Sequence, residues 1–160
     1  DQRIKAYLEN REAGYSGIGT TLSGNALQLA CMRAVLEQIL TEDVYAAAMP
    51  LAQELEQGIA ALIAHHRLPW RIVRVGLRAE IVSAGELPRN GTEALLHAHS
   101  DEEQALHLFC LNRGVVITPF HNMMLVCPQT GPEHITRLLD VLDAGMSELS
   151  GTATARSTTN

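Results

Sequence analysis

The sequence has few aromatic residues and no surplus of positive charge. Only six of its 160 residues are aromatic, and 12 basic residues face 18 acidic ones, for a formal net charge of −6. So few rings argue against a surface on which nucleic-acid bases stack, and the acidic balance argues against a nucleic-acid-binding domain, which normally presents a basic face. No stretch approaches the ~20 apolar residues of a membrane-spanning helix. We therefore expect neither nucleic acid nor a membrane as a partner.

Lysine is nearly absent as well. Lys5 is the single lysine, beside eleven arginines. Any reaction that needs a lysine amine from this chain therefore has to use Lys5. The sequence also opens on Asp1, without an initiator methionine or a signal peptide, which predicts an excised piece or a processed product.

The three cysteines are too few and too widely spaced for a cysteine framework. Cys31, Cys110 and Cys127 form no C-x-x-C pair, which argues against both a set of disulfides and a zinc knuckle. Cys31 and Cys110 lie among apolar neighbours in helical patterns, so we expect them to be buried free thiols. Unpaired thiols are typical of a reducing compartment, and a cytoplasmic location is expected.

Apolar residues recur at helical spacing in three long segments. The first covers residues 27–39, and the second runs from a candidate N-cap at Thr41 to the basic residues at 65–67. Pro50 lies inside the second segment, where it is expected to start or kink a turn. The third helix is predicted over 132–149, after a glycine and at a proline that suits the first helical turn.

Short segments rich in β-branched residues lie between these helices. Residues 70–75 and 77–82 flank Gly76 and predict either a hairpin or one bulged strand. A further short strand is predicted at 115–118, and another apolar run follows at 123–126.

One more helix and a tail complete the pattern. Residues 101–112 are predicted to be helical, with Ser100 as N-cap and Glu103 completing a capping box. The small polar residues 151–160 are expected to form a disordered tail. Together the segments predict an α+β fold, with a short, mostly antiparallel sheet and helices on one of its faces.

The loop at residues 13–25 has the composition of an anion site. It contains four glycines, two threonines and two serines, has no charge, and leads into the first long helix. Glycines let backbone N–H groups approach a ligand, and a helix N-terminus attracts an anion such as phosphate. The other interpretation is a plain loop that ends in an N-cap. The motifs of P-loop and dinucleotide-binding proteins are not matched.

The order of these motifs resembles a known enzyme family. Thr20-Thr21-Leu22-Ser23-Gly24-Asn25-Ala26 is similar to the G-T-x-S-G-N-P segment of class III (fold type I) pyridoxal-phosphate-dependent aminotransferases, relatives of glutamate-1-semialdehyde aminomutase. Residues 114–119 resemble the family's G-V-x-x-x-P strand, and 132–149 its closing helix. The resemblance covers residues 13–149 and identifies only the C-terminal portion of such an enzyme.

The resemblance implies a division of the chain. Residues 1–40 would form the end of the large domain, with the phosphate-binding loop and the start of the interdomain helix. Residues 41–150 would form the small C-terminal domain, ahead of the tail at 151–160. The family's phosphate-binding threonine comes from the neighbouring subunit of a homodimer and corresponds to Thr21, beside Thr20. Pyridoxal 5′-phosphate is the implied cofactor, and an amino donor and an oxo acceptor are the implied substrates.

The resemblance also implies that the chain contains no catalytic residue. The family's Schiff-base lysine lies farther upstream of Thr21 than this chain extends, and Lys5 lacks the glycines that follow that lysine. The expected function is therefore a part of an aminotransferase or aminomutase that is inactive by itself. The alternative is a non-catalytic α+β module for binding or dimerisation.

Two polar segments are candidates for binding the substrate. His121 and Asn122 follow the strand that resembles the family's, close to where small-domain residues approach the substrate entrance. Arg74 and Arg78 alternate around the possible hairpin, and either could pair with a substrate carboxylate.

A histidine cluster is the remaining candidate. His97, His99, Asp101 and His107 contain ligand types that bind metals, but surface histidines without an ordered fourth ligand are the preferred interpretation, and no metal site is predicted.

Overall fold

The computed structural model describes residues 2–10, 22–97, 100–118 and 122–157. The chain divides into two compact units, Asp1–Thr41 and Glu42–Asn160. No helix among these residues is long and apolar enough to cross a membrane.

The first unit contains two described helices, α1 (Gln2–Glu9) and α2 (Ala26–Gln38). Asn25 caps α2, since its side chain accepts a hydrogen bond from the Gln28 N–H. The predicted helix is confirmed, but none of its residues is buried among the described residues. The prediction of a buried Cys31 is therefore wrong for this chain, where that thiol is exposed. No described helix or strand covers its apolar neighbours on α2.

The second unit begins with the long helix α3 (Glu42–His65). The helix continues through Pro50 without ending there. A proline inside a helix costs about 3 kcal/mol, and the apolar face of α3 compensates because it is buried on both sides of the proline, at Ala48, Ala52, Leu55, Ile59 and Ile63.

A three-stranded antiparallel sheet follows, in the order β1 (Arg71–Val75), β2 (Arg78–Val82) and β3 (Met123–Leu125). β1 and β2 form a hairpin with Val75 opposite Arg78. Of the two structures that the sequence allowed here, a hairpin or one bulged strand, the hairpin is therefore the one that forms. Gly76 starts the two-residue turn with φ of 60°, a left-handed conformation that glycine adopts without strain.

The third strand differs from the prediction. The sequence placed it at residues 115–118, but these residues have no strand structure and β3 lies at Met123–Leu125 instead. Met123 is the partner of Glu80 on β2. Residues 115–118 then lie outside the ladder, where the Thr118 N–H donates to the Met123 carbonyl oxygen at 3.2 Å.

Three helices complete the unit: α4 (Gly91–His97), α5 (Asp101–Leu111) and α6 (Pro132–Ser157). Ser100 caps α5 as predicted. α6 extends to Ser157, whereas the sequence predicted disorder from residue 151. The last seven residues contain no proline, and extending an existing helix fixes one residue per added hydrogen bond, which is far easier than nucleating a new one.

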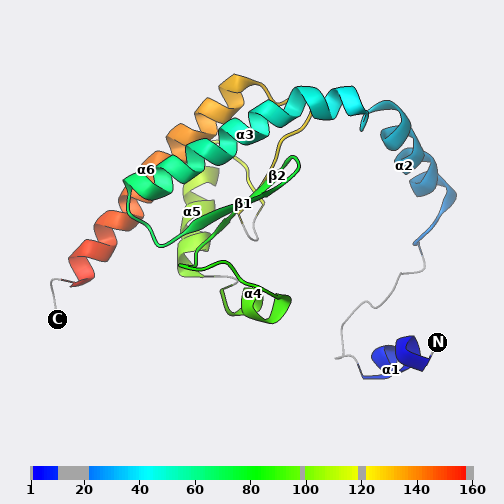
Figure 1. Cartoon of the computed structure of the whole chain (residues 1–160), viewed down its shortest axis with the longest axis horizontal. Coiled ribbons are helices and arrows are strands. Elements are labelled where there is room, and N and C mark those ends of the chain that lie inside the picture. The colour runs from blue at the N-terminus through cyan, green and yellow to red at the C-terminus, as the bar shows by residue number, and fades with distance from the viewer. Residues whose placement is uncertain (1, 11–21, 98–99, 119–121, 158–160) are drawn as a thin grey trace. The chain divides into compact units, whose positions relative to one another are not determined.

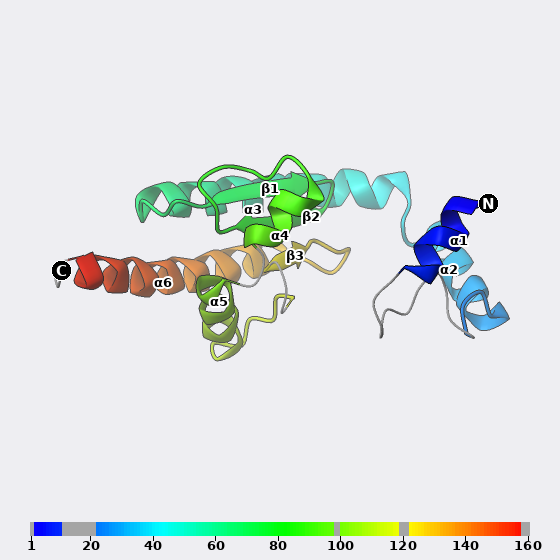
Figure 2. The same cartoon turned by 90° about the horizontal axis from the view of Figure 1, so that it is seen from below.

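The core lies between α3, α6, α5 and one face of the sheet, as Figures 1 and 2 show. α3 and α6 run side by side, and α5 packs against α6. Ala79, Ile81 and Met124 point to the buried face of the sheet, while Val75, Arg78 and Leu125 on the other face are exposed. The predicted α+β fold with a short antiparallel sheet is confirmed.

Candidate functional site

The expected phosphate-binding residues Thr20 and Thr21 lie outside the described residues. The turn that follows them is described. Asn25 accepts a hydrogen bond from the Gln28 N–H at 3.0 Å, and its Nδ2 donates to the Leu22 carbonyl oxygen at 2.8 Å. Gly24 has φ of 73°, and a Cβ there would meet open space. The side chain of Asn25 therefore fixes the approach of this loop to α2.

The N-terminus of α2 has a donor set that suits a phosphate. The cap at Asn25 engages the Gln28 N–H, while the N–H groups of Ala26 and Leu27 belong to the first turn, whose donors have no partner within the helix. They carry the partial positive charge of the helix terminus. Neutral donors of this kind fit a phosphate group.

The segment around the predicted substrate-binding residues is held by several hydrogen bonds. His121 lies outside the described residues, but Thr118 and Met123 on either side are paired. The Met123 N–H donates to Thr118 Oγ1 at 3.0 Å, and the same hydroxyl donates to the Met123 carbonyl oxygen at 3.2 Å. The two ends of the segment are thereby held together.

Asn122 is the one polar residue that is fully buried among the described residues, with 2% of its surface exposed. Its Nδ2 donates to the Glu103 carbonyl oxygen in α5 at 3.0 Å. Its backbone has φ of 39°, in the left-handed region that asparagine tolerates better than most residues. Within this chain, the Asn122 amide therefore has a protein partner, and substrate binding by Asn122 stays a prediction.

The acceptor of that bond belongs to a polar cluster at the start of α5. The Glu103 N–H donates to Ser100 Oγ at 3.2 Å, and Ser83 Oγ donates to Glu103 Oε1 at 3.2 Å. Ser83 Oγ also lies 3.1 Å from Ser100 Oγ. Because Ser83 gives its proton to the carboxylate, Ser100 is the donor to Ser83. The cluster ties the segment after β2 to the first turn of α5.

The structure separates the two candidate arginines. Arg74 points to α3: its Nε donates to Glu56 Oε2 at 2.6 Å and its Nη1 to the Gly76 carbonyl oxygen at 2.7 Å, and its side chain is only 18% exposed. Arg78 lies on the opposite face of the sheet, 53% exposed, with one bond to Glu80 Oε2 at 3.1 Å. Of the two, Arg78 is therefore the one whose guanidinium is accessible to a carboxylate.

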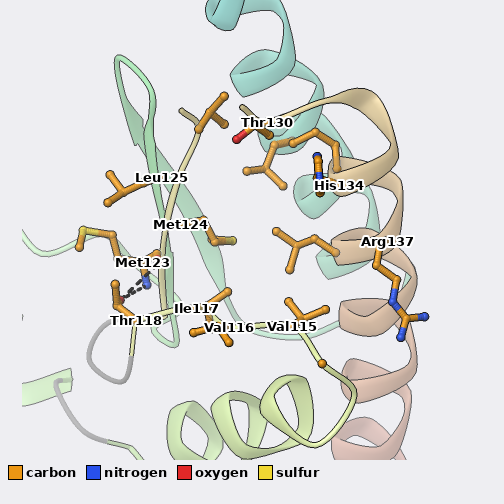
Figure 3. Close-up of a pocket in the computed structure, with 15 residues that line it drawn as sticks. Val115, Val116, Ile117, Thr118, Met123, Met124, Leu125, Thr130, His134 and Arg137 are labelled. Carbon is orange, nitrogen blue, oxygen red and sulfur yellow. Dashed lines mark hydrogen bonds between the residues drawn. The ribbon is translucent and has the colours of Figure 1, made fainter. Parts of the chain in front are cut away.

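A pocket of about 600 Å³ lies between β3, the segment 114–118 and α6 (Figure 3). Most of its lining is aliphatic, including the exposed side chains of Val116 and Leu125. Its polar side chains have partners in the chain: Arg137 donates to the Arg113 carbonyl oxygen at 2.9 Å, and His134 Nδ1 accepts from the Gly131 N–H at 2.9 Å. The pocket can thus accept an apolar group. No sequence signal marked it, because its residues come from separate segments.

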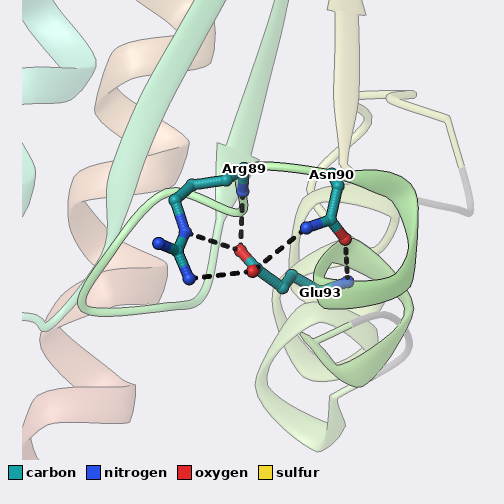
Figure 4. Close-up of polar contacts among 3 residues, drawn as sticks. All are labelled: Arg89, Asn90 and Glu93. Atoms are coloured by element: carbon teal, nitrogen blue, oxygen red, sulfur yellow. Dashed lines mark hydrogen bonds and ion pairs between the residues drawn. The ribbon is translucent and has the colours of Figure 1, made fainter.

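The start of α4 has a polar cluster that the sequence analysis missed (Figure 4). The Glu93 carboxylate accepts hydrogen bonds from the Arg89 backbone N–H at 2.8 Å and from Arg89 Nη2 at 3.0 Å. Asn90 Oδ1 in turn accepts from the Glu93 N–H at 3.0 Å. An asparagine followed by a glutamate three residues later is a helix-start signal, but the surrounding glycines and prolines indicated only turns. The cluster caps a short helix, and we assign it no binding role.

The remaining candidates are Lys5, the histidine cluster and the cysteines. Lys5 lies on α1, exposed, with its Nζ 3.8 Å from Glu9 Oε1. Among the described residues, no three potential metal ligands come together, while the His97 side chain and His99 lie outside the description. All three cysteines are free.

The comparisons with known proteins find matches among solved structures. No family model matches the chain, and no relative was found among curated proteins. Among solved structures, a glutamate-1-semialdehyde aminomutase from Pseudomonas aeruginosa is 43% identical, with a TM-score of 0.73 over 92% of this chain. A variant of that enzyme, solved in complex with PMP, matches equally well.

More distant structures share the fold. An omega-transaminase from Sphaerobacter thermophilus is 16% identical with a TM-score of 0.64, over 89% of this chain. A β-phenylalanine aminotransferase from Variovorax paradoxus is 17% identical with the same TM-score, over 86% of this chain. The chain spans about a third of the length of each of these proteins: 34% of the aminomutase, 33% of the omega-transaminase and 32% of the β-phenylalanine aminotransferase.

Proposed function

We infer that this chain, whose sequence and fold are those of the C-terminal portion of a class III (fold type I) pyridoxal-phosphate-dependent enzyme, works as one part of an aminotransferase or aminomutase. The complete enzyme would transfer an amino group between an amino acid or amine and an oxo acid or aldehyde. The observation that carries this proposal is the 43% identity to an aminomutase over 92% of the chain. A match over 92% of the chain includes residues of both units.

Pyridoxal 5′-phosphate is the cofactor we propose for the complete enzyme, in line with the PMP complex of the aminomutase variant. When bound, it supplies the electron sink for amino-group transfer. This chain would hold its phosphate: Thr21, beside Thr20, would donate hydrogen bonds from its hydroxyl. The free N–H groups at the start of α2 would add neutral donors and the partial charge of the helix.

We propose a homodimer in which Thr21 of one subunit reaches the cofactor of the other. The exposed apolar residues of α2 support this arrangement: Leu27 is 74% exposed, Leu36 57% and Met32 54%. A helix that is apolar on most of its surface is normally covered by protein. In the proposed enzyme, the rest of the large domain and the partner subunit would cover this apolar helix. A small-domain segment with His121 would approach the substrate, and the enzyme would work in the cytoplasm, which suits free thiols.

The chain alone is proposed to be inactive, because the lysine that binds the cofactor covalently would belong to the part that precedes it. Lys5 is a poor replacement, since it is exposed on α1 and its Nζ lies near Glu9.

Cofactor trapping tests the proposal directly. The chain is titrated with pyridoxal phosphate, reduced with borohydride, digested and mapped by mass spectrometry. We expect no stoichiometric adduct on Lys5, only the slow modification of an exposed amine. The upstream coding sequence is read in parallel, where a lysine followed by glycines is expected about thirty residues before Thr21. Rapid, stoichiometric trapping of Lys5, or a stop codon upstream, would refute the proposal and favour a self-contained module.

A further inference from the structure

Arg67 occupies a backbone position that normally belongs to glycine. It follows the last turn of α3 with φ of 53°, in the left-handed region. Its N–H donates to the Ala64 carbonyl oxygen at 3.2 Å, and the Leu68 N–H donates to the Ile63 carbonyl oxygen at 3.1 Å. These two bonds form the Schellman motif that ends many helices, and its left-handed residue is usually glycine.

An arginine adopts this conformation only with backbone strain. The helix dipole favours a cation near the end of α3, but an arginine one turn earlier would satisfy the dipole without strain. The position of the Arg67 side chain therefore points to a further role for its guanidinium.

A pocket of about 400 Å³ lies beside Arg67, between the end of α3 and β1. The two elements pack against each other, and a short loop turns the chain from one into the other (Figure 1). Trp70, which is 4% exposed, forms part of the pocket wall. The other apolar residues of the wall are Ala60, Ile63, Ala64, Leu68 and Ile72.

Arg67 and Arg71 border this pocket, and both are exposed. Among the described residues neither forms an ion pair: Arg71 Nη1 donates to the Trp70 carbonyl oxygen at 2.9 Å, and the Arg67 guanidinium has no partner. Since a guanidinium carries five N–H donors, most of the donors of both arginines remain available to a ligand.

The chain supplies little negative charge at this place. Although it carries 18 acidic residues, none lies between Glu56 and Glu80 in the sequence. Asp143 of α6 reaches the end of α3, but it pairs with His66 at 2.7 Å. The two arginines therefore form a positive site on a chain whose formal net charge is −6.

β1 adds a neutral donor to the pocket. It is an edge strand of the sheet, and the backbone groups of Val75 and Arg78 face each other across the two-residue turn of the hairpin. Because successive residues of a strand point their backbone groups to alternate sides, the N–H of Ile72 points to the free edge. Ile72 also lines the pocket.

We propose that this pocket binds a small organic carboxylate with an apolar body. The carboxylate would pair with Arg67 and Arg71, whose planar guanidinium groups match its geometry. The apolar body would contact Trp70 and the aliphatic wall. A mostly apolar wall with a few placed polar groups is typical of small-molecule sites. The inference does not depend on the proposed function, since every residue it uses belongs to the second unit of this chain.

Trp70 makes binding measurable in the 160-residue chain. It is the single tryptophan, so its fluorescence reports on this pocket. We expect hexanoate to change the emission saturably, with a Kd of about 1 mM. Hexanol, which has the tail without the charge, should bind at least about 10-fold more weakly, as should acetate and inorganic phosphate, which have charge without a tail. Saturation-transfer NMR of the ligand detects binding that leaves the emission unchanged.

Four variants separate binding from folding. Arg67→Gly relieves the strain, so its melting temperature should not fall, but hexanoate should bind about 10-fold more weakly. Arg71→Gln should weaken binding to a similar extent. Ala64→Leu, at an exposed helical position, should weaken it by filling part of the pocket. Arg89→Gln removes the same charge from a residue that is 86% exposed on the approach to α4, and it should bind hexanoate like the wild type.

Three results would overturn the inference. The first is the absence of hexanoate binding by both methods. The second is binding that is unchanged in Arg67→Gly, or weakened as much in Arg89→Gln as in Arg67→Gly. The third is binding of hexanol or inorganic phosphate as tight as that of hexanoate, which would make the pocket a plain apolar surface or a plain anion site.

Discussion

Cys127 and Cys110 are thiols in opposite surroundings. Cys127 is exposed, and its pKa is lowered by the hydroxyl of Thr130, which donates to its Sγ at 3.5 Å, and by the Gln129 backbone N–H. Cys110 is buried, and burial raises its pKa to about 11, with Arg113 opposing the rise. Because the thiolate is the nucleophile, we expect iodoacetamide to modify Cys127 and leave Cys110 unmodified until the chain unfolds.

Mass spectrometry of the timed alkylation checks this expectation, with Cys31 replaced by serine so that the two thiols are compared alone. Thr130→Val should slow the reaction of Cys127 several-fold, and Thr130→Ser, which keeps the hydroxyl, should not. Equal rates in Thr130→Val and the wild type would show that the hydroxyl does not control the thiol.

The raised pKa of Cys110 also predicts how stability depends on pH. The thiol ionises near 9.0 when exposed and at about 11 in the folded chain. The neutral form is therefore favoured by folding, and the stabilisation is complete below pH 9 and is lost as the pH rises toward 11. We expect the free energy of unfolding to fall over this range by up to about 1.4 kcal/mol per pH unit from this group.

Urea unfolding at a series of alkaline pH values measures that slope. Cys110→Ala lowers stability at every pH, because it leaves a cavity in the core, but it should flatten the loss between pH 9 and 11. If the slope in Cys110→Ala matches the wild type, other groups account for the alkaline loss.

At the scale of elements, Gly58 determines how closely α3 approaches α6. A Cβ at this position would lie 2.5 Å from Leu139 Cδ1 and 2.8 Å from Cδ2. Overpacking of this kind costs about 1–3 kcal/mol, against a gain of about 1 kcal/mol from placing alanine in a helix. We expect Gly58→Ala to destabilise the chain by about 1 kcal/mol, measured by thermal or urea unfolding.

Gly91 provides the matched control for that substitution. It is also helical, but a Cβ there would meet no atom within 4 Å. Gly91→Ala should therefore leave stability unchanged or raise it by up to about 1 kcal/mol. A Gly58→Ala variant as stable as Gly91→Ala would mean that Leu139 moves aside without cost.

The elements also show how far the sequence determines the fold. The helices with regular apolar spacing and clear caps, such as α5 after Ser100, lie where the pattern predicted them. The third strand was misplaced, because 115–118 and 123–126 are equally apolar and only tertiary pairing with Glu80 selects Met123. The short helix α4 was missed because the surrounding turn residues masked its Asn90 cap.

The candidate site was predictable only in part. Local motifs pointed to Thr21 and His121, which lie outside the described residues, so neither assignment is tested by the geometry. The choice between Arg74 and Arg78 needed the structure. Alternation along a strand shows whether two residues lie on the same face of the sheet, but it does not show which face the helices cover. The buried amide of Asn122 donates its hydrogen bond to the carbonyl oxygen of Glu103, nineteen residues away, and no local pattern reveals such a contact.

At the scale of the whole molecule, the two compact units differ in how much apolar surface they leave exposed. The core that runs through α3, the sheet, α5 and α6 lies entirely within Glu42–Asn160, whereas α2 buries none of its residues among those described. Exposed apolar surface of this extent promotes association. We therefore expect the full chain to associate with itself in a concentration-dependent way, through the first unit.

A chain shortened to residues 41–160, which keeps Thr41 ahead of α3, tests this expectation. Sedimentation velocity should show a monomer over a range of concentrations at which the full chain associates, and the melting temperature should stay within a few degrees of the full chain. Replacing Leu29 and Leu36 by glutamate in the full chain should weaken association without unfolding the second unit, because both side chains are exposed, 48% and 57%. If the shortened chain still associates, the surface responsible lies on the second unit, where the exposed Val116 and Leu125 beside the pocket would be the next residues to replace.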